Sequence, residues 1–280
     1  MTVNPYVAAY DVLALTYERV LVPLFRPIAK RMMQRVDLRP GWSVLDAGTG
    51  TGLVALLGAP RVGKDGKIIG VDASEGMLAI ARQKAERFGF FQCEFRTGDL
   101  NGLDFPDGTF NACLSQFALH HTNLERSLAE LARVLAPGGT LVIQDWAGET
   151  SPLHQAVYDV LVRYRVAEPG EWVAGMRENS SRARAFRLEF GRPEAMQTAV
   201  AAHGLNAVEA FEEIYPARVA TADAFIEIAT VSPIMQAELS AMSLDQRLHF
   251  LDEARLALAQ LQTGGAFEWR YHVVSVVGRK

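Results

Sequence analysis

The segment from Val44 to Gly52, Val-Leu-Asp-Ala-Gly-Thr-Gly-Thr-Gly, constrains the fold more than any other part of the chain. An apolar stretch that predicts a short strand leads into it, and its alternate glycines permit a turn with positive φ before a helix that begins near Leu53. A strand, a glycine turn and a helix in this order form a cradle for a nucleotide-type ligand. Leu53 occupies the position where a dinucleotide fingerprint requires its third glycine, so the spacing departs from the dehydrogenase pattern.

Asp46 lies just ahead of the first of these glycines. A carboxylate there would repel a pyrophosphate at the helix N-terminus but would suit a ligand that carries a cationic amine and a sulfonium. The segment resembles the first motif of the class I S-adenosylmethionine-dependent methyltransferases. That resemblance implies S-adenosylmethionine as the cofactor, and cofactor contacts from Asp46, Gly48, Thr49, Gly50 and Gly52.

Strand-like and helix-like segments alternate after the glycine turn. With 280 residues, 49% of them hydrophobic, the chain can bury a large core. The alternation predicts right-handed crossovers and a parallel sheet, hence an α/β fold. The expected elements are strands at Lys67–Asp72, Cys93–Thr97, Phe110–Gln116 and Thr140–Asp145, and helices at Ser74–Phe88 and Thr122–Leu135.

Acidic residues follow two of these strands. Asp72 ends the strand that follows the glycine turn, where a carboxylate can accept hydrogen bonds from both ribose hydroxyls; the alternative is an N-cap of the next helix. Gly98-Asp99-Leu100 follows the third strand and resembles the family's adenine motif, although Gly-Asp by itself is usually only a turn. Asp99 could accept from the adenine amino group while Leu100 or Met77 contacts the ring. The resemblance adds Ala73 to the cofactor contacts.

The fourth strand resembles another family motif, in which Asn111 replaces the usual acid. Ligands of open α/β sheets bind at the carboxyl ends of the strands, and we expect three residues of this strand end to face the cofactor: Ser115, Gln116 and Phe117. Leu119-His120-His121 continues the family pattern. If the methyl acceptor is a hydroxyl, His120 or His121 is the nearest candidate for a general base; the alternative is packing against the cofactor or capping a helix.

The N-terminal segment Tyr6–Met33 has helical spacing interrupted by prolines, which predicts two or three short helices. Tyr10-Asp11 and Tyr17-Glu18 resemble the aromatic-acid pairs of methyltransferases of the ubiquinone/menaquinone-biosynthesis type, in which this segment covers the cofactor. The resemblance makes Tyr17 a cofactor contact. The alternative is an amphipathic helix that uses tyrosine to fill the core.

The second half changes rhythm at Ser151, where a capped helix to Tyr164 is expected. Arg182, Arg184 and Arg187 lie in a further helical stretch and could bind an anionic group or form a solvated face. Strand patterns recur at Leu205–Ile214 and Trp269–Val277, and between them a capping box at Ser243 opens a helix that Gly264-Gly265 should terminate.

The family resemblance implies a Rossmann-like, seven-stranded, mostly parallel sheet with an antiparallel edge hairpin, the seventh strand lying between the fifth and sixth. We expect helical lid insertions on this sheet. The division is a helical lid at 1–35, a cofactor-binding core at 36–146, a helical insertion at 147–192, and the end of the core sheet at 193–280 with a helical insertion at 216–264.

Composition narrows the partners. The net charge of -4 gives no basic field for nucleic acid, and no apolar run reaches the ~20 residues that span a bilayer. We expect a cytoplasmic protein, without a leader segment, that acts on a small molecule, and the sequence leaves a homodimer open. Cys93 and Cys113 should be buried free thiols, and no metal-binding spacing is present; the adjacent His120 and His121 should point their rings in different directions.

The ordered motifs predict methyl transfer from S-adenosylmethionine to a small-molecule acceptor by in-line displacement. An NAD(P)-dependent oxidoreductase is the enzymatic alternative and would place a pyrophosphate beside Asp46. A catalytically inactive adenosylmethionine-binding protein is the third possibility. The motifs do not identify the acceptor, nor whether an O, N, S or C atom receives the methyl group.

Overall fold

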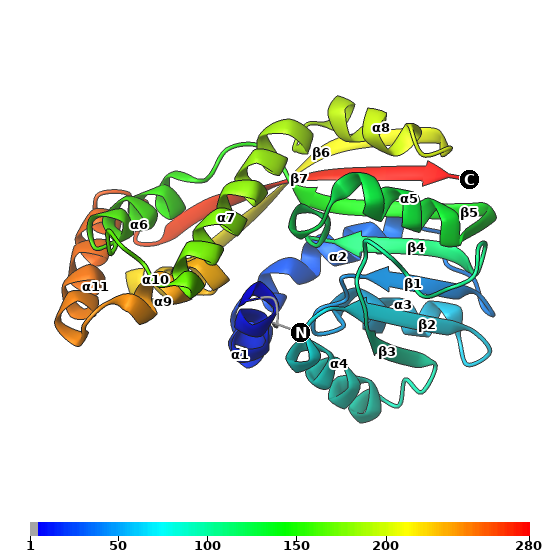
Figure 1. Cartoon of the computed structure of the whole chain (residues 1–280), viewed down its shortest axis with the longest axis horizontal. Helices are drawn as coiled ribbons and strands as arrows, with labels where there is room; N and C mark the ends of the chain where they lie inside the picture. The colour runs from blue at the N-terminus through cyan, green and yellow to red at the C-terminus, as the bar shows by residue number, and fades with distance from the viewer. Residues whose placement is uncertain (1–4) are drawn as a thin grey trace.

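The computed structural model describes residues 5–280, which form one seven-stranded sheet covered by helices, with a further group of helices beyond one end of the sheet (Figure 1). The strand order is β3-β2-β1-β4-β5-β7-β6; β7 is antiparallel to both of its neighbours and the remaining pairs are parallel. The predicted sheet, including the position of the seventh strand, is confirmed. The strands are β1 Ser43–Ala47, β2 Lys67–Asp72, β3 Cys93–Thr97, β4 Phe110–Gln116, β5 Leu135–Trp146, β6 Asn206–Val219 and β7 Phe267–Arg279.

Each face of the sheet has its own apolar core. One core packs strand residues against α5 and α8, through side chains such as Leu128 and Met196. The other packs them against α2, α3 and α4, through side chains such as Met32 and Leu78. Burial on both faces explains why the parallel strands read as continuous apolar runs. The helices are α2 Val22–Arg35, α3 Leu53–Val62, α4 Glu75–Phe88, α5 Leu124–Val134 and α8 Pro193–Ala201, with the 3₁₀ turn η1 Leu119–His121.

The remaining helices form a cap at the carboxyl ends of the parallel strands and around the far half of the β6–β7 hairpin (Figure 1). The N-terminal segment is two helices, as expected, with the break at Leu21, and Pro27 lies inside the second. Ser151 and Ser243 cap their helices as predicted, the latter with a full capping box. The cap helices are α1 Pro5–Val20, α6 Pro152–Arg163, α7 Glu171–Phe190, α9 Ala222–Thr230, α10 Pro233–Ala241 and α11 Leu244–Ala259.

Three predicted boundaries were wrong by several residues. Strand β5 begins at Leu135 rather than at Thr140, because Leu135 already pairs with Phe110 of β4. Strand β6 continues to Val219 rather than ending at Ile214, because it is the edge strand and Pro216 therefore removes no bond to a further neighbour. Helix α11 ends at Ala259, before the glycines, because Thr263 and Ala266 exchange backbone hydrogen bonds in the turn that leads into β7.

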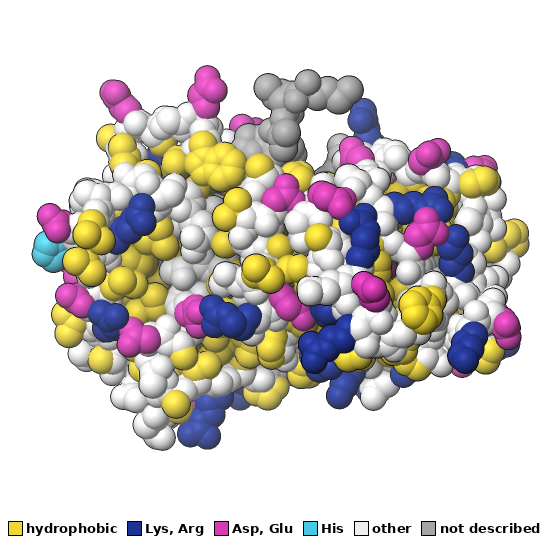
Figure 2. All heavy atoms as spheres, turned by 90° about the horizontal axis from the view of Figure 1, so that it is seen from below, with side chains coloured by type: hydrophobic (Ala, Val, Ile, Leu, Met, Phe, Trp, Pro, Cys, Tyr) yellow, Lys and Arg dark blue, Asp and Glu magenta, His cyan; other side chains and the backbone are white. Residues whose placement is uncertain are grey.

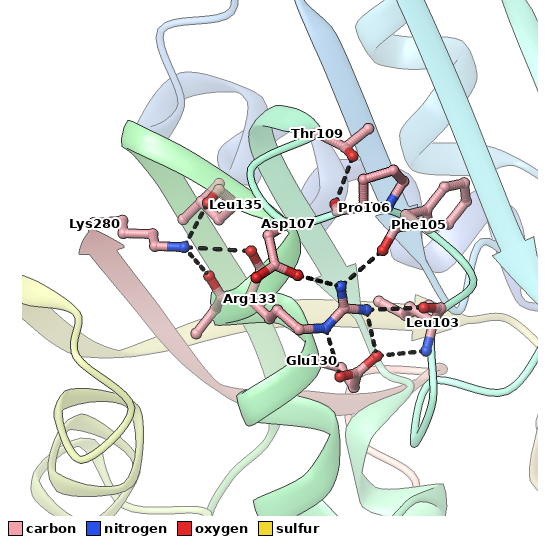
Figure 3. Close-up of polar contacts among 10 residues, drawn as sticks. Leu103, Phe105, Pro106, Asp107, Thr109, Glu130, Arg133, Leu135 and Lys280 are labelled. Atoms are coloured by element: carbon pink, nitrogen blue, oxygen red, sulfur yellow. Dashed lines mark hydrogen bonds and ion pairs between the residues drawn. The ribbon is translucent and has the colours of Figure 1, made fainter.

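A polar network fixes the end of the sheet opposite the carboxyl ends of the parallel strands (Figure 3). Arg133 of α5 donates to the carbonyls of Leu103 and Phe105 at 2.9 and 2.7 Å and pairs with Glu130 and Asp107, both at 2.8 Å. The Lys280 ammonium donates to carbonyls at the end of α5, among them those of Ala132 and Leu135. The loop after β3 and the chain end are thus tied to one helix.

The surface is mixed in charge. Figure 2 shows acidic and basic side chains interspersed on the face seen from below, with hydrophobic side chains denser in the half that carries α9–α11. Across residues 5–280, no helix has both the length and the apolar character to cross a membrane. Cys113 is buried, Cys93 is half-buried rather than buried, and both are free thiols.

Candidate active site

The glycine turn brings β1 against the end of β4. Gly48, Gly50 and Gly52 have φ angles of 74°, 52° and 83°, a region that side chains disfavour. A Cβ atom on Gly48 would lie 2.1 Å from the Cβ of Ala118, so only glycine allows the two segments to approach. Around Gly50 no atom lies within 4 Å of such a position, which leaves this part of the turn open to a ligand.

Asp46 holds this turn together from within. Its side chain is 1% exposed, and one oxygen accepts hydrogen bonds from Thr49 Oγ1 at 2.6 Å and from the backbone N–H of Ala55 at 2.9 Å. Burial raises its pKa to about 7, against these two bonds, which act to lower it. The carboxylate is therefore a structural acceptor for the turn and α3 as well as a candidate partner for a ligand cation.

A small cavity adjoins Asp46. Its volume is about 30 Å³, and the glycine turn, Tyr17, Phe25 and Gln116 line it. A single water needs roughly 10–15 Å³ of such volume, so the cavity is far smaller than the amino-acid end of S-adenosylmethionine. The residues fit the group chemically, with an acid, glycine backbone and an amide around the space. Helices α1 and α2 contribute one wall of the cavity, through Tyr17, Val22 and Phe25.

Asp72 reaches the glycine turn from β2. Its carboxylate accepts from the backbone N–H of Gly50 at 2.8 Å and from that of Ser74 at 2.9 Å, and burial raises its pKa. Ser74, not Asp72, is the N-cap of α4, because its hydroxyl accepts from Met77 N. Asp72 thus lies beside the open part of the turn, where a ribose ligand is expected.

The predicted adenine contacts gather on the next loop. Gly98 donates its N–H to the Asp72 carbonyl at 3.0 Å, which holds the two acid-bearing loops side by side. Asp99 is exposed and accepts from the backbone and side-chain nitrogens of Asn101 at 2.9 and 2.7 Å. Leu100 and Met77 are buried, whereas Ala73 is exposed at the rim.

The three candidate residues at the end of β4 differ in their surroundings. Ser115 is buried and donates to the Ala47 carbonyl at 2.9 Å, which leaves its hydroxyl occupied by the sheet. Gln116 lines the cavity. Phe117 has a φ of 54°, the one positive φ among described residues other than glycine, and stacks on Trp146 with ring centroids 3.9 Å apart. Asn111, in place of the usual acid, accepts from Ser43 N.

The expectation that His120 and His121 point apart was wrong. They lie in the single turn η1, where their ring centroids are 3.8 Å apart. His120 Nδ1 lies 2.7 Å from an oxygen of Asp145, whose side chain is fully buried. His121 Nε2 lies 3.2 Å from the hydroxyl of Tyr10, and burial holds the pKa of this imidazole well below its usual range. A buried carboxylate thus orients the ring of His120, whereas His121 contacts Tyr10 in a buried environment.

Helix α1 uses the two halves of each aromatic-acid pair differently. Tyr10 and Tyr17 point inward, and burial raises the pKa of both. Asp11 accepts from Ser74 Oγ at 2.6 Å and from Gly76 N at 2.8 Å, at the start of α4. Glu18 pairs with Lys84 of α4 at 2.8 Å. The acids anchor α1 on α4, while Tyr17 lines the cavity and Tyr10 contacts His121.

Sequence reasoning missed Asp145 and the anchoring role of Asp11. Asp145 had a signal, since an acid directly follows the buried Thr140–Gln144 run and so comes out at the ligand edge of the sheet. The arginines of α7 do not converge on the site: Arg182 and Arg184 are exposed, and Arg187 donates to Thr150 Oγ1 at 2.6 Å. Within residues 5–280, no group of three or more His, Cys, Asp or Glu side chains could hold a metal ion.

Known proteins resemble this chain over its central domain or over its whole length. A family model described as a methyltransferase domain matches residues 44–139. The chain is 31% identical over 282 residues to nocamycin O-methyltransferase of Saccharothrix syringae, with 96% of each chain covered. It is 35% identical over 124 residues to the ubiquinone/menaquinone biosynthesis C-methyltransferase of Hydrogenovibrio crunogenus, but this match spans 44% of the chain and about half (49%) of the relative.

Solved structures share the fold at lower identity. The YcgJ protein of Bacillus subtilis aligns over 90% of this chain and 97% of its own with a TM-score of 0.56 at 22% identity. Phosphoethanolamine N-methyltransferase 2 of Haemonchus contortus, crystallised with S-adenosylmethionine, aligns over 96% of this chain and 57% of its own with a TM-score of 0.59 at 16% identity.

The strand order and these structural neighbours define a Rossmann-like α/β fold of the kind expected from the sequence. More particularly, the whole-length relative and the matching domain place the chain in the S-adenosylmethionine-dependent methyltransferase family, to which it belongs. S-adenosylmethionine is accordingly its cofactor, and no comparison supports the oxidoreductase alternative.

Proposed function

We propose that this enzyme methylates a hydroxyl group of a small, largely apolar molecule, with His120 as the general base. The observation that carries the proposal is the 2.7 Å contact between His120 Nδ1 and buried Asp145 at the ligand edge of the sheet. A carboxylate that accepts from Nδ1–H fixes the tautomer of the ring and leaves Nε2 to take a proton. Amine or thiol acceptors need less help from a base than an alcohol does.

The bound cofactor supplies an electrophilic methyl group on its sulfonium. The chain must then bind, orient and exclude water. Asp72, which accepts from Gly50 beside the turn, would hold the ribose, and Asp99 would hold the adenine amino group. Asp46 and the turn at Gly48–Gly52, which line the cavity, would receive the amino-acid end. Thr49, Ala73, Met77, Gly98, Leu100 and Phe117 complete the proposed cofactor contacts, and Ser115 supports β4 through Ala47.

An aromatic wall supports the choice of an apolar acceptor. Phe25, Phe117, Trp146 and Tyr271 contact one another with ring centroids 3.9 to 6.0 Å apart, beside the cavity that Phe25 lines. Such faces bind planar or apolar molecules. On the face that Figure 2 shows, acidic and basic side chains are interspersed, which does not favour a nucleic-acid backbone there. The full-length O-methyltransferase relative points the same way, whereas the C-methyltransferase relative matches only about half of the chain.

The test is a methylation assay with methyl-labelled S-adenosylmethionine and a panel of phenols, alcohols and amines. We expect methyl ethers as products, and we expect His120→Gln and Asp145→Asn to lower kcat at least 10²-fold, the usual contribution of a general base. Binding of S-adenosylhomocysteine should change little in either variant. Product methylated at carbon or nitrogen, or full activity of His120→Gln, would contradict the proposal. Cofactor binding with no turnover of any acceptor would favour the catalytically inactive alternative.

Two further expectations stay predictions. A homodimer would use the exposed leucines of α11, Leu244, Leu248 and Leu256, and sedimentation velocity tests it. The cytoplasmic location expected from the sequence is tested by fractionation of the source cells.

A further inference from the structure

A row of polar side chains crosses the otherwise apolar face of the sheet that α2 covers. Gln116 Nε2 donates to Gln144 Oε1 at 2.9 Å, and Gln144 Nε2 donates to Ser275 Oγ at 3.2 Å. Ser275 in turn donates to Glu213. The four residues come from four adjacent strands, β4, β5, β7 and β6, and the paired positions Gln116, Gln144 and Ser275 lie directly opposite one another.

The middle of this row is sealed from water. Gln144 and Ser275 are 0% exposed, and the neighbouring positions on the same face, among them Leu114 and Val142, belong to the apolar core. Buried amides and hydroxyls cost stability unless each is hydrogen-bonded, so a chain of them in an apolar sheet calls for a role. The row begins at the cavity, which Gln116 lines, and ends at Glu213 under α2.

Glu213, at the end of the row away from the cavity, determines which residues of the row donate and which accept. Arg35 donates to Glu213 at 2.7 Å and Arg31 at 3.2 Å. Burial acts to raise the pKa of Glu213, but the bonds from Arg35 and Ser275 outweigh it and the pKa is lowered. Glu213 is therefore ionised at neutral pH, and an ionised carboxylate can only accept hydrogen bonds.

The donor and acceptor roles of the other three residues follow from the ionised state of Glu213. Ser275 must give its single proton to Glu213, so its oxygen can only accept from the next residue. Gln144 must therefore present its NH₂ group to Ser275 and its carbonyl oxygen to Gln116. Gln116 must present its own NH₂ group to Gln144, and its carbonyl oxygen Oε1 is left for the cavity, since no hydrogen bond to this atom is found within residues 5–280.

We propose that Glu213, Ser275 and Gln144 are positioning residues which orient the amide of Gln116 so that its carbonyl oxygen receives the ammonium group of the cofactor's amino-acid end. Asp46 is a second acceptor that lines this cavity, and the pair offers oxygen atoms to a donor that carries only N–H bonds. A flipped amide would instead direct an NH₂ group at the ammonium. The inference rests on the proposed placement of the cofactor's amino-acid end beside Asp46.

The experiment compares two probes by titration calorimetry. S-adenosylhomocysteine carries the amino-acid end, and 5′-methylthioadenosine shares its nucleoside but lacks that end. Glu213→Gln keeps the size of the side chain but lets it donate, which removes the cause of the row's direction, and Ser275→Ala breaks the row at its centre. The matched control is Glu212→Gln, since Glu212 is half exposed on the opposite face of β6 and contacts His272.

We expect Glu213→Gln and Ser275→Ala to weaken S-adenosylhomocysteine about tenfold, equivalent to ~1.4 kcal/mol, and to change methylthioadenosine less than twofold. Ser275→Thr, which keeps the hydroxyl, should restore most of the loss, and Glu212→Gln should match the wild type for both probes. Equal weakening of both probes, or no weakening of either, would overturn the proposal. Wild-type protein that binds neither probe would instead remove the proposed function. Urea unfolding of each variant identifies any that do not fold, and the remaining variant then decides.

Discussion

At the scale of single residues, two effects act in opposite directions on the protonation of Asp46. Inside the protein its burial favours the protonated form and raises its pKa to about 7, yet a cofactor cation beside it favours the ionised form. Because the folded-state pKa lies above the unfolded value near 3.8, the folded protein holds a proton that the unfolded chain releases between these two pH values. The proton on Asp46 therefore raises the free energy of unfolding below about pH 4, and this contribution disappears as the pH rises to about 7.

We predict that Asp46→Asn removes this loss, which amounts to a few kcal/mol because one pKa unit corresponds to ~1.4 kcal/mol. Urea unfolding between pH 4 and 8 should show wild-type stability falling relative to the variant up to pH 7 and running parallel above it. Asp37→Asn, at an exposed position, is the control and should track the wild type throughout. Parallel curves for wild type and Asp46→Asn over the whole range would show that Asp46 is ionised in the free protein.

The two carboxylates at the strand ends give a second prediction for single residues. Asp72→Ala should weaken binding of S-adenosylhomocysteine more than Asp99→Ala, because two bonds to ribose hydroxyls are lost in the first and one bond to adenine in the second, each worth ~1.5–3 kcal/mol. Calorimetry on the two folded variants measures the order. Equal or reversed losses would mean that the ribose and adenine roles are assigned wrongly.

At the scale of elements, prediction succeeded where local pattern decides the outcome. β2 and β4 have the expected bounds, because apolar runs of strand length between turn signals leave little choice. The edge strand β6 was predicted too short, because a proline stops a strand only where its missing N–H would have had a partner. That condition depends on the position of β6 in the sheet, which only the assembled topology provides.

The sequence also predicts only part of the candidate site. The glycine turn and the acids at strand ends are readable from the sequence because motif order fixes their place. The contacts of His120 with Asp145 and of Asp11 with Gly76 join residues far apart in the chain. Pairing of β4 with β5 brings the first two together, and packing of α1 on α4 brings the second two together. No spacing in the sequence encodes such a distance.

The prediction at the scale of elements concerns Gly76, where α1 packs on α4. A Cβ atom at this position would lie 2.7 Å from the backbone of Asp11, so α1 can dock on α4 only because this residue is glycine. Gly76→Ala should lift α1, raise its hydrogen exchange at least tenfold and weaken S-adenosylhomocysteine, while the core strands keep their protection. The control is Gly175→Ala in α7, where no atom lies within 4 Å and alanine should stabilise by roughly 0.5–1 kcal/mol. Unchanged exchange of α1 in Gly76→Ala would show that the helix needs no such close approach.

At the scale of the whole molecule, the question is how the cofactor enters, since the cavity of about 30 Å³ that Tyr17 and Phe25 line is smaller than its amino-acid end. We predict that residues 6–33 and 153–190 form a mobile lid that also excludes water during transfer. Hydrogen exchange in these two segments should slow when S-adenosylhomocysteine binds, and the strands of the sheet serve as the internal reference.

The opposing account makes both segments a permanent part of the core, and the burial of Leu153, Val157 and Val160 is consistent with it. Exchange that is equally slow with and without ligand in both segments would decide for that account. The contacts of Asp11 and Glu18 would then hold α1 in place permanently, with or without ligand.

The β6–β7 hairpin continues past the last pairing of β7 with β5, at Val273 and Trp146, as an arm that runs from Ile214–Val219 on one strand to Phe267–His272 on the other. Helices α9 to α11 hang between the two tips of this arm (Figure 1). The same helices also contact the rest of the cap, since Glu238 of α10 pairs with Arg177 of α7 and Glu227 of α9 pairs with Arg19 of α1. Because residues 222–259 join the two tips of one hairpin, their sequence can change without altering the strand order that carries the glycine turn, and we expect acceptor preference among relatives to vary with this block.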